Sequence, residues 1–370
     1  MEVKIGAVSL GCDKNRVDLE KMLAKLKNAG FTIGADPDNC DVLIINTCAF
    51  IRPSEEEAIN EIIRAGKLKE SGKVGKIVVT GCLSQRRYKD LLENLPEIDK
   101  VLYLRENESI VNIISTLTGF KAEDKKGAMR AITTSGASAY LKIADGCNNA
   151  CSYCTIPSIR GRYRSENMDT LIDEAKELAK QGIKELVLVA QDTTRYGEDL
   201  KNTDLIKLCK KLCSIKGIEF IRLHYCYPEK ITKELLDYMK SEPKMCKYLD
   251  IPLQHIDDEI LKNMRRRLDE KQTRELISMI KKDYPEFALR TTFIVGFPNE
   301  SRAQFKKLCK FLQEVKFDYA GFFPYYQEEF TYSYFMKGQK SNFAKQHRLK
   351  IVQKIQAEIV TELARDKIGK

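Results

Sequence analysis

Short and almost uninterrupted apolar runs recur through residues 1–118, and they limit the fold of this part of the chain more than any other feature. The runs are VKIGAVSL (3–10), VLIIN (42–46), KIVVT (76–80) and VLYL (101–104). Such strands are typical of a parallel sheet that is covered on both faces. Helical patterns separate them, for example at 15–30, which ends at Gly30, and from 53 onward. This alternation predicts an open, doubly wound α/β sheet.

Three of these strands are followed directly by a cysteine. The segments are LGC (10–12), NTC (46–48) and TGC (80–82). Open α/β sheets bind ligands at the carboxyl ends of their strands. We therefore expect Cys12, Cys48 and Cys82 to converge there as a metal site. The alternative is a flavin or nucleotide domain with incidental loop cysteines, although no G-x-G-x-x-G motif supports nucleotide binding.

The second part of the chain has a different pattern. Residues 120–138 lose apolar periodicity and indicate a linker. Six strand-like runs follow, separated by helical stretches such as 168–182 and 258–283: 140–145, 185–191, 221–226, 248–252, 289–297 and 319–326. Six βα units predict an open three-quarter barrel with its active site at the strand carboxyl ends. The expected division is thus 1–119, a linker at 120–138, and 139–370 ending in a helix.

The loop CNNACSYC (147–154) carries three thiols, at Cys147, Cys151 and Cys154, just after the first barrel strand. Disulfides use cysteines in pairs, and a structural zinc site needs four ligands. Three thiolates can instead hold three irons of a 4Fe-4S cluster and leave the fourth iron open. The alternative is three unrelated buried cysteines.

Composition sets the remaining limits. The 370 residues are enough for two domains, and 43% hydrophobic with 31% charged residues is typical of a soluble globular protein. Twelve cysteines without an export signal indicate the cytoplasm and metal binding. No run approaches the length of a membrane helix, so no membrane partner is expected. The net charge of +10 is compatible with RNA contact.

The cysteine loop after the first strand of an incomplete barrel resembles the radical S-adenosylmethionine (SAM) superfamily. An N-terminal α/β domain with three more cysteines is similar to the methylthiotransferases. Longer phrases resemble the RimO-type family: SLGCDKN (9–15), INTCAFI (45–51), IADGCNNACSYCTIPSIRGRYRS (143–165), LVLVAQDTTRYG (186–197), YLDIPLQH (248–255) and LRTTFIVGFP (289–298). That family adds a methylthio group to the β-carbon of an aspartate in small-subunit ribosomal protein twelve.

The resemblance implies two 4Fe-4S clusters and SAM. Cys147, Cys151 and Cys154 would hold the cluster that binds SAM, while Cys12, Cys48 and Cys82 would hold an auxiliary cluster that carries an exchangeable sulfur. The chemistry would take place at the clusters, with no side chain as acid or base. Flavodoxin or ferredoxin would donate the electron.

Eight further residues lie where such a barrel would bind SAM. Each has an alternative as a packing or hydrogen-bonding residue, and they are Tyr153, Gln191, Asp192, Asp250, Gln254, Arg290, Gly296 and Phe297. His255 is expected to be structural. Arg265, Arg266 and Arg267 are expected on the solvated face of a helix, whereas Arg160, Arg162 and Arg164 are expected at the mouth of the site.

The sequence departs from the family in two places. No TRAM module is expected after the last helix, whose apolar stripe ends at Leu363, and EEFT (328–331) stands where the family has E-x-G-T. Two rival functions stay open. A tRNA adenosine methylthiotransferase would share the clusters and the fold, and a non-enzymatic iron–sulfur protein would ligate every iron itself.

Overall fold

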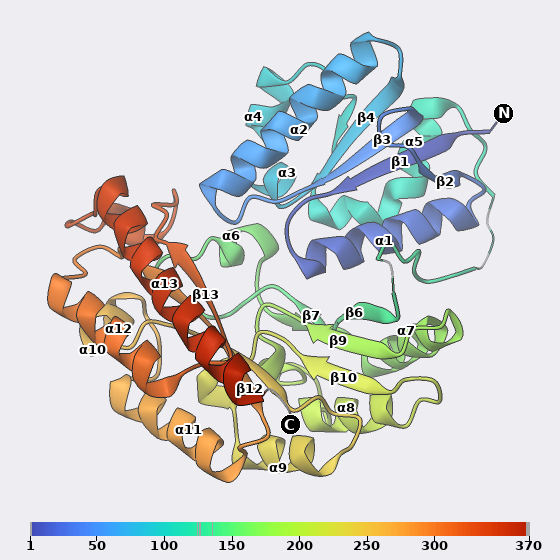
Figure 1. The fold of residues 1–370 in the computed structure, drawn as a ribbon. Helices are drawn as coiled ribbons and strands as arrows, with labels where there is room; N and C mark the ends of the chain where they lie inside the picture. Colours follow the sequence, from blue (N-terminus) through green and yellow to red (C-terminus); the bar gives the residue numbers. More distant parts are fainter. Residues whose placement is uncertain (1, 124, 126, 135, 368–370) are drawn as a thin grey trace.

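The computed structural model describes residues 2–123, 125, 127–134 and 136–367, and Figure 1 shows two sheet-based units joined by an extended segment. Within the described residues, the first unit has a five-stranded parallel sheet in the order β2-β1-β3-β4-β5. Its elements are β1 (Lys4–Ser9), α1 (Asp13–Asn28), β2 (Thr32–Ala35), β3 (Cys40–Thr47), α2 (Arg52–Glu70), β4 (Val74–Gly81), α3 (Cys82–Arg86), α4 (Tyr88–Asn94), β5 (Lys100–Val101), η1 (Leu104–Ser109) and α5 (Ile110–Thr118).

The alternation of side chains along β3 explains why helices cover both faces of this sheet. Val42 and Ile44 are buried against α1 and α5, whereas Leu43 and Ile45 are buried against α2. The predicted doubly wound sheet is therefore confirmed. Because the chain leaves β1 and β3 in opposite directions along the sheet, their carboxyl ends form the crevice in which such folds bind ligands.

The structure of this unit differs from the sequence-based expectation in two places. The run VLYL does not form a strand throughout, because β5 ends at Val101 and a 3₁₀ helix begins at Leu104. The edge strand β2 was not predicted, since its four residues TIGA are short and only partly buried.

The second unit begins with β6 (Ser138–Lys142). Its other elements are β7 (Ala144–Asp145), α6 (Ile156–Arg160), β8 (Arg164–Ser165), α7 (Met168–Lys180), β9 (Glu185–Val189), η2 (Thr193–Arg195), α8 (Leu205–Cys213), β10 (Phe220–Leu223), η3 (Pro228–Lys230), α9 (Lys233–Ser241), β11 (Tyr248–Gln254), α10 (Asp258–Asn263), α11 (Glu270–Asp283), β12 (Ala288–Val295), α12 (Arg302–Val315), β13 (Tyr319–Pro324), η4 (Tyr332–Phe335) and α13 (Asn342–Lys367).

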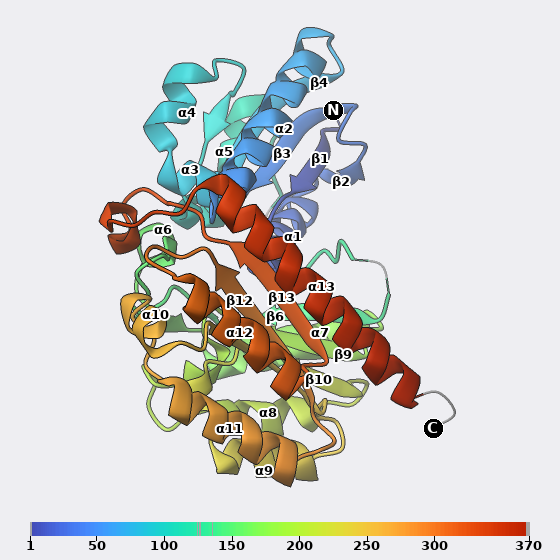
Figure 2. The same cartoon turned by 60° about the vertical axis from the view of Figure 1, so that its left-hand side comes forward.

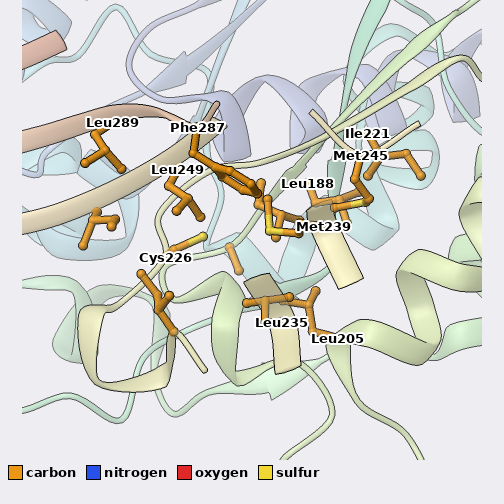
Figure 3. Packing of buried hydrophobic residues seen from close by; sticks show 14 of the residues in the cluster. Leu188, Leu205, Ile221, Cys226, Leu235, Met239, Met245, Leu249, Phe287 and Leu289 are labelled. Atoms are coloured by element: carbon orange, nitrogen blue, oxygen red, sulfur yellow. The ribbon is translucent and has the colours of Figure 1, made fainter. Parts of the chain in front are cut away.

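The six long strands form two parallel sheets, β10-β9-β6 and β11-β12-β13. Backbone hydrogen bonds connect the two sheets, including one from Cys226 N to Asp250 O at 2.8 Å. Helices cover the outer face, and their apolar side chains share one buried cluster with those of the strands; Figure 3 shows Leu235, Met239 and Leu249 in this cluster. The predicted open barrel is therefore confirmed.

The predicted helix over 258–283 is interrupted, because α10 ends at Asn263 and α11 begins at Glu270. Asp269 starts the second helix as a capping box with Gln272. The helix expected at the C-terminus is present as α13, which runs along β13 and α12 in Figure 2 and buries Val352 and Ile359.

The segment between the units is held at Arg130, whose side chain is buried. One Arg130 nitrogen donates to Glu174 Oε1 at 2.6 Å and to Tyr140 O at 3.0 Å, and the other pairs with Glu20 of α1. Backbone N–H of Thr133 also donates to the Glu20 carboxylate, at 2.9 Å. This buried network fixes α1 against β6 and α7, so that the carboxyl ends of both sheets face each other.

Candidate active site

Three loops of the N-terminal sheet bring their cysteines together. Cys12 follows β1, Cys48 follows β3 and Cys82 begins α3 directly after β4. Gly11 permits this approach: its φ is +94°, and a Cβ there would lie 2.6 Å from Cys48 Cβ. Gly81 has a φ of +103°, and a Cβ there would lie 2.3 Å from Thr47 O. The three loops thus meet at one edge of the sheet, as the strand-end pattern predicts, and the metal site at these cysteines stays a prediction.

Asn15, in the first turn of α1 and fully buried, connects these loops. Its amide nitrogen donates to Thr47 O at 2.9 Å and to Leu10 O at 3.3 Å. Its side-chain oxygen accepts from the Cys82 thiol at 3.6 Å. One side chain therefore touches the loops after β1, β3 and β4.

The second group of thiols lies on a loop that leaves the barrel after β7 and returns at β8. The two short strands pair antiparallel, Ala144 with Ser165 and Asp145 with Arg164, and close the base of the loop. Cys147 N donates to Gly161 O at 3.1 Å, which brings the two sides of the loop together. Backbone N–H of Asn149 donates to Cys147 Sγ at 3.4 Å.

This loop docks on the N-terminal unit beside Cys82. Its helix α6 packs against α3, and Ile159 is buried in the apolar cluster of the N-terminal sheet. The next residue, Arg160, has a side chain only 1% exposed and donates to Asn15 Oδ1 at 2.5 Å and to Asp18 Oδ2 at 3.0 Å. Its other nitrogen donates to both oxygens of Asp145, at 2.8 and 3.0 Å. The Arg160–Asn15 contact thus joins the two cysteine groups.

Buried charges around this contact compensate one another. Burial would raise the pKa of Asp145, but Lys142 and Arg160 outweigh that effect and hold the pKa well below its usual range. Lys142 contacts both Asp145 and Asp18. Two cations and two carboxylates therefore form a closed network between the units.

Most of these cysteine thiols are buried. Burial raises the pKa of Cys82 to about 11 and that of Cys154 to about 12, and it also raises the pKa of Cys48 and of Cys147. Thiols with such pKa values are protonated at neutral pH, and metal binding must displace the proton. Within the described residues, no three His, Cys, Asp or Glu side chains are placed to share one metal ion. A cluster requires a different arrangement, because each thiolate binds its own iron.

Comparison with known proteins identifies the family of this chain. Residues 141–312 match the radical SAM superfamily, and residues 4–103 match the uncharacterized protein family UPF0004. A protein of Elusimicrobium minutum named ribosomal protein uS12 methylthiotransferase RimO is 45% identical over 99% of this chain and 86% of its own length. A protein of the same name from Thermoanaerobacter sp. is 44% identical over the same shares. The chain belongs to the RimO family.

Solved structures agree with the fold. The radical SAM methyltransferase TsrM from Kitasatospora setae, solved with cobalamin and a [4Fe-4S] cluster, superposes with a TM-score of 0.64 at 14% identity, over 88% of this chain and 75% of that chain. The cobalamin-dependent radical SAM enzyme OxsB gives 0.58 at 12% identity, over 98% and 56%. Membership in the radical SAM superfamily implies SAM and one 4Fe-4S cluster. In the described part of the chain, no helix is long and apolar enough to span a bilayer.

Arg266 and Tyr227 were not predicted at this RimO-family site. Arg266 donates to Pro252 O at 2.9 Å and to Cys151 Sγ at 3.8 Å, and its guanidinium lies 4.5 Å from the Tyr227 ring centroid. The expectation of a solvated helix face was therefore wrong for Arg266. Arg265 stacks on Tyr332 and Arg267 is 55% exposed, and the three arginines lie in the turn between α10 and α11.

The polar residues predicted to contact SAM already have protein partners. Asp192 accepts from Asn149 Nδ2 at 3.0 Å and from Arg195 Nε at 2.9 Å, which ties β9 to the cysteine loop. Gln191 donates to Asp145 Oδ1 at 3.4 Å, while its own side-chain oxygen is buried and has no hydrogen-bond partner among the described residues. Whether these groups also contact SAM stays a prediction.

Asp250 and Arg290 face each other on neighbouring strands. Asp250 accepts from Tyr225 N at 3.1 Å, and its other oxygen lies 3.9 Å from Arg290 Nε. Arg290 is 43% exposed, so it retains room for a second anion. Gln254 has a φ of +73° at the end of β11.

The remaining predicted residues form the apolar side of the site. Phe297 is buried edge-on against Tyr325, with ring centroids 5.2 Å apart, and Tyr153 packs against the same cluster. Gly296, with a φ of +75°, donates its N–H to Glu300. Glu300 also binds His255 and Arg348, so His255 is structural, as predicted.

The unusual EEFT segment forms a strained turn beside the site. Phe330 has a φ of +65°, a conformation that glycine adopts without strain. Glu328 accepts from the Arg52 N–H at 2.7 Å and from Arg86 at 3.0 Å, and thereby attaches the barrel to α2 and α3. The two units therefore meet on this side as well.

Proposed function

We propose that this protein adds a methylthio group to the β-carbon of an aspartate in ribosomal protein uS12. The RimO-family relatives that match almost the whole chain are named ribosomal protein uS12 methylthiotransferases. The observation that carries the proposal is the pair of thiol groups on facing loops, joined through Asn15 and Arg160 at 2.5 Å. An enzyme that only generates a radical has no need of the second group.

The donor set fits two iron–sulfur clusters. Each group offers three thiols on separate loop positions, and three thiolates leave one iron of a 4Fe-4S cluster open. We assign Cys147, Cys151 and Cys154 to the cluster that binds SAM, and Cys12, Cys48 and Cys82 to the auxiliary cluster. When bound, the clusters and SAM would supply the radical, the sulfur and the methyl group.

The protein's own residues position these groups and exclude water. Asn15 and Arg160 fix the distance between the two sets of loops, and Asp192 orients the cysteine loop through Asn149. Arg266 and Tyr227 cover Cys151 from the barrel side. The SAM contacts of Tyr153, Gln191, Asp192, Asp250, Gln254, Arg290, Gly296 and Phe297 belong to this proposal.

The same proposal includes the cellular setting. The protein would act in the cytoplasm with flavodoxin or ferredoxin as electron donor, and exposed Arg267 would be available for RNA near the substrate. The division into 1–119, 120–138 and 139–370 is likewise proposed, and the family matches at 4–103 and 141–312 support it.

The test compares two substrates under identical conditions. Reconstituted protein is incubated with SAM, sulfide and reductant, and with either uS12 or unmodified tRNA. We expect mass spectrometry to show a methylthio group in place of hydrogen on one uS12 aspartate. Modified tRNA beside unchanged uS12 would overturn the proposal in favour of the adenosine-modifying class.

A further inference from the structure

Lys14 is a buried cation that forms no salt bridge with the described carboxylates, although the adjacent Asp13 carboxylate is near enough to interact with it. It lies in the first turn of α1, two residues after Cys12, and is only 7% exposed. Its ammonium sits 3.6 Å from the ring centroid of Tyr225. Among the described residues, no hydrogen bond or salt bridge to this ammonium is present, whereas nearby Lys142 and Arg160 are both paired with carboxylates.

This arrangement is costly unless another anion completes it. Buried charges in proteins are normally paired or hydrogen-bonded. A cation–π contact contributes about 0.5–2 kcal/mol, which does not replace an anion. The position is that of a binding group directed at a ligand.

The polar groups around Lys14 have other partners. Asp13, its neighbour, accepts from the Tyr225 hydroxyl at 3.3 Å and lies 3.8 Å from His224 Nδ1. Tyr225 is held rigidly with a φ of +58°, because its N–H donates to Asp250 at 3.1 Å and its carbonyl accepts from Thr193 at 3.1 Å. The ring beneath the ammonium is therefore a fixed platform.

Tyr225 also places Lys14 beside the auxiliary thiols. Lys14 follows Cys12 by two residues at the start of α1, and the Tyr225 ring beneath its ammonium follows β10. The ammonium therefore lies at the carboxyl end of β10, where the N-terminal unit meets the barrel.

We propose that Lys14, held over Tyr225, binds the side-chain carboxylate of the target aspartate. This inference rests on the proposed function. The carbon to be modified is bonded directly to that carboxylate, so an ammonium beside Cys12 would place the carbon next to the sulfur-carrying site. It would also favour aspartate over asparagine, because only aspartate brings a further negative charge to the buried ammonium.

The test is a cycle of two proteins and two peptides. One labelled peptide spans the uS12 target aspartate, and its match has asparagine there. Binding to the iron-loaded protein is measured by fluorescence anisotropy. A hydrogen bond to a charged group implies about tenfold to hundredfold in affinity. We expect Lys14→Gln to lose that factor for the aspartate peptide and almost nothing for the asparagine peptide.

Two controls accompany the cycle. Lys27→Gln removes an exposed charge from the other end of the same helix, and we expect it to bind both peptides as the wild type does. Lys14→Arg keeps the charge and should retain the preference for aspartate. Iron content and 5′-deoxyadenosine formation without peptide are measured in all variants, and both should be unchanged in Lys27→Gln.

The possible outcomes distinguish a failure of the Lys14 assignment from a failure of the proposed function. If Lys14→Gln weakens both peptides equally or neither, the carboxylate assignment is wrong. If it abolishes 5′-deoxyadenosine formation without peptide, Lys14 serves SAM and the assignment is also wrong. If the wild type binds neither peptide, the proposed function falls, and the assignment falls with it.

Discussion

Replacing Asn15 with alanine tests the link between the two cysteine groups. The change removes two neutral hydrogen bonds to Thr47 O and Leu10 O, a weaker one from the Cys82 thiol, and one with the charged Arg160. Neutral hydrogen bonds contribute about 0.5–1.5 kcal/mol and charged ones about 1.5–3 kcal/mol, so we expect the free energy of unfolding to fall by about 3–5 kcal/mol. The loops after β1 and β3 would also lose their common anchor.

Two measurements check this expectation. Urea unfolding gives the free energy, and iron analysis of reconstituted protein should show a selective loss at the auxiliary site. The matched control is Asn28→Ala on the same helix, which removes one hydrogen bond, to Ala128 O at 2.9 Å. If Asn15→Ala changes the free energy of unfolding no more than this control and retains all its iron, the reasoning about Asn15 is refuted.

Three further changes should have distinct effects. Arg130→Ala leaves Glu20 and Glu174 buried without their cation. Urea titrations should show a free energy of unfolding lower by about 3–5 kcal/mol. A loss smaller than that expected for an exposed ion pair would contradict this prediction. Gly11→Ala adds strain at φ +94° and a clash with a cysteine, so iron analysis should show auxiliary iron lost while the other cluster remains. Burial raises the pKa of Asp99 but its two lysine partners lower it more, so its stabilising effect should be full above about pH 4 and vanish in acid as pH falls through the lowered pKa. Wild type and Asp99→Asn would then differ in unfolding free energy at pH 7 and converge at low pH, and a constant difference would contradict the argument.

The sequence was sufficient to place the six cysteines because their neighbours are long apolar strands. A strand as apolar as β3 is buried on both faces, which is typical of a parallel sheet. The carboxyl ends of parallel strands share one edge, so Cys48 lies at that edge. The loop that carries Cys147 could be placed by the same argument. The alternation of strands and helices in the sequence therefore predicted both the fold and the convergence of the thiols.

Contacts between loops could not be predicted in this way. Arg266 stands in a run of arginines that is typical of a solvated surface, yet the backbone carbonyl of Pro252 in β11 and the ring of Tyr227 lie against it. Asn15 and Arg160 are 145 positions apart, and no periodicity connects them. The position of Lys14 over the Tyr225 ring likewise joins residues 211 positions apart, and no periodicity predicts it.

The most direct test of the account is the iron and sulfide content of anaerobically reconstituted protein, compared with two triple alanine variants, one at Cys147, Cys151 and Cys154 and the other at Cys12, Cys48 and Cys82. Two independent 4Fe-4S clusters predict about eight irons in the wild type and about four in each variant. About four irons in the wild type and none after loss of the barrel cysteines would contradict the account, because the N-terminal thiols would then hold no cluster.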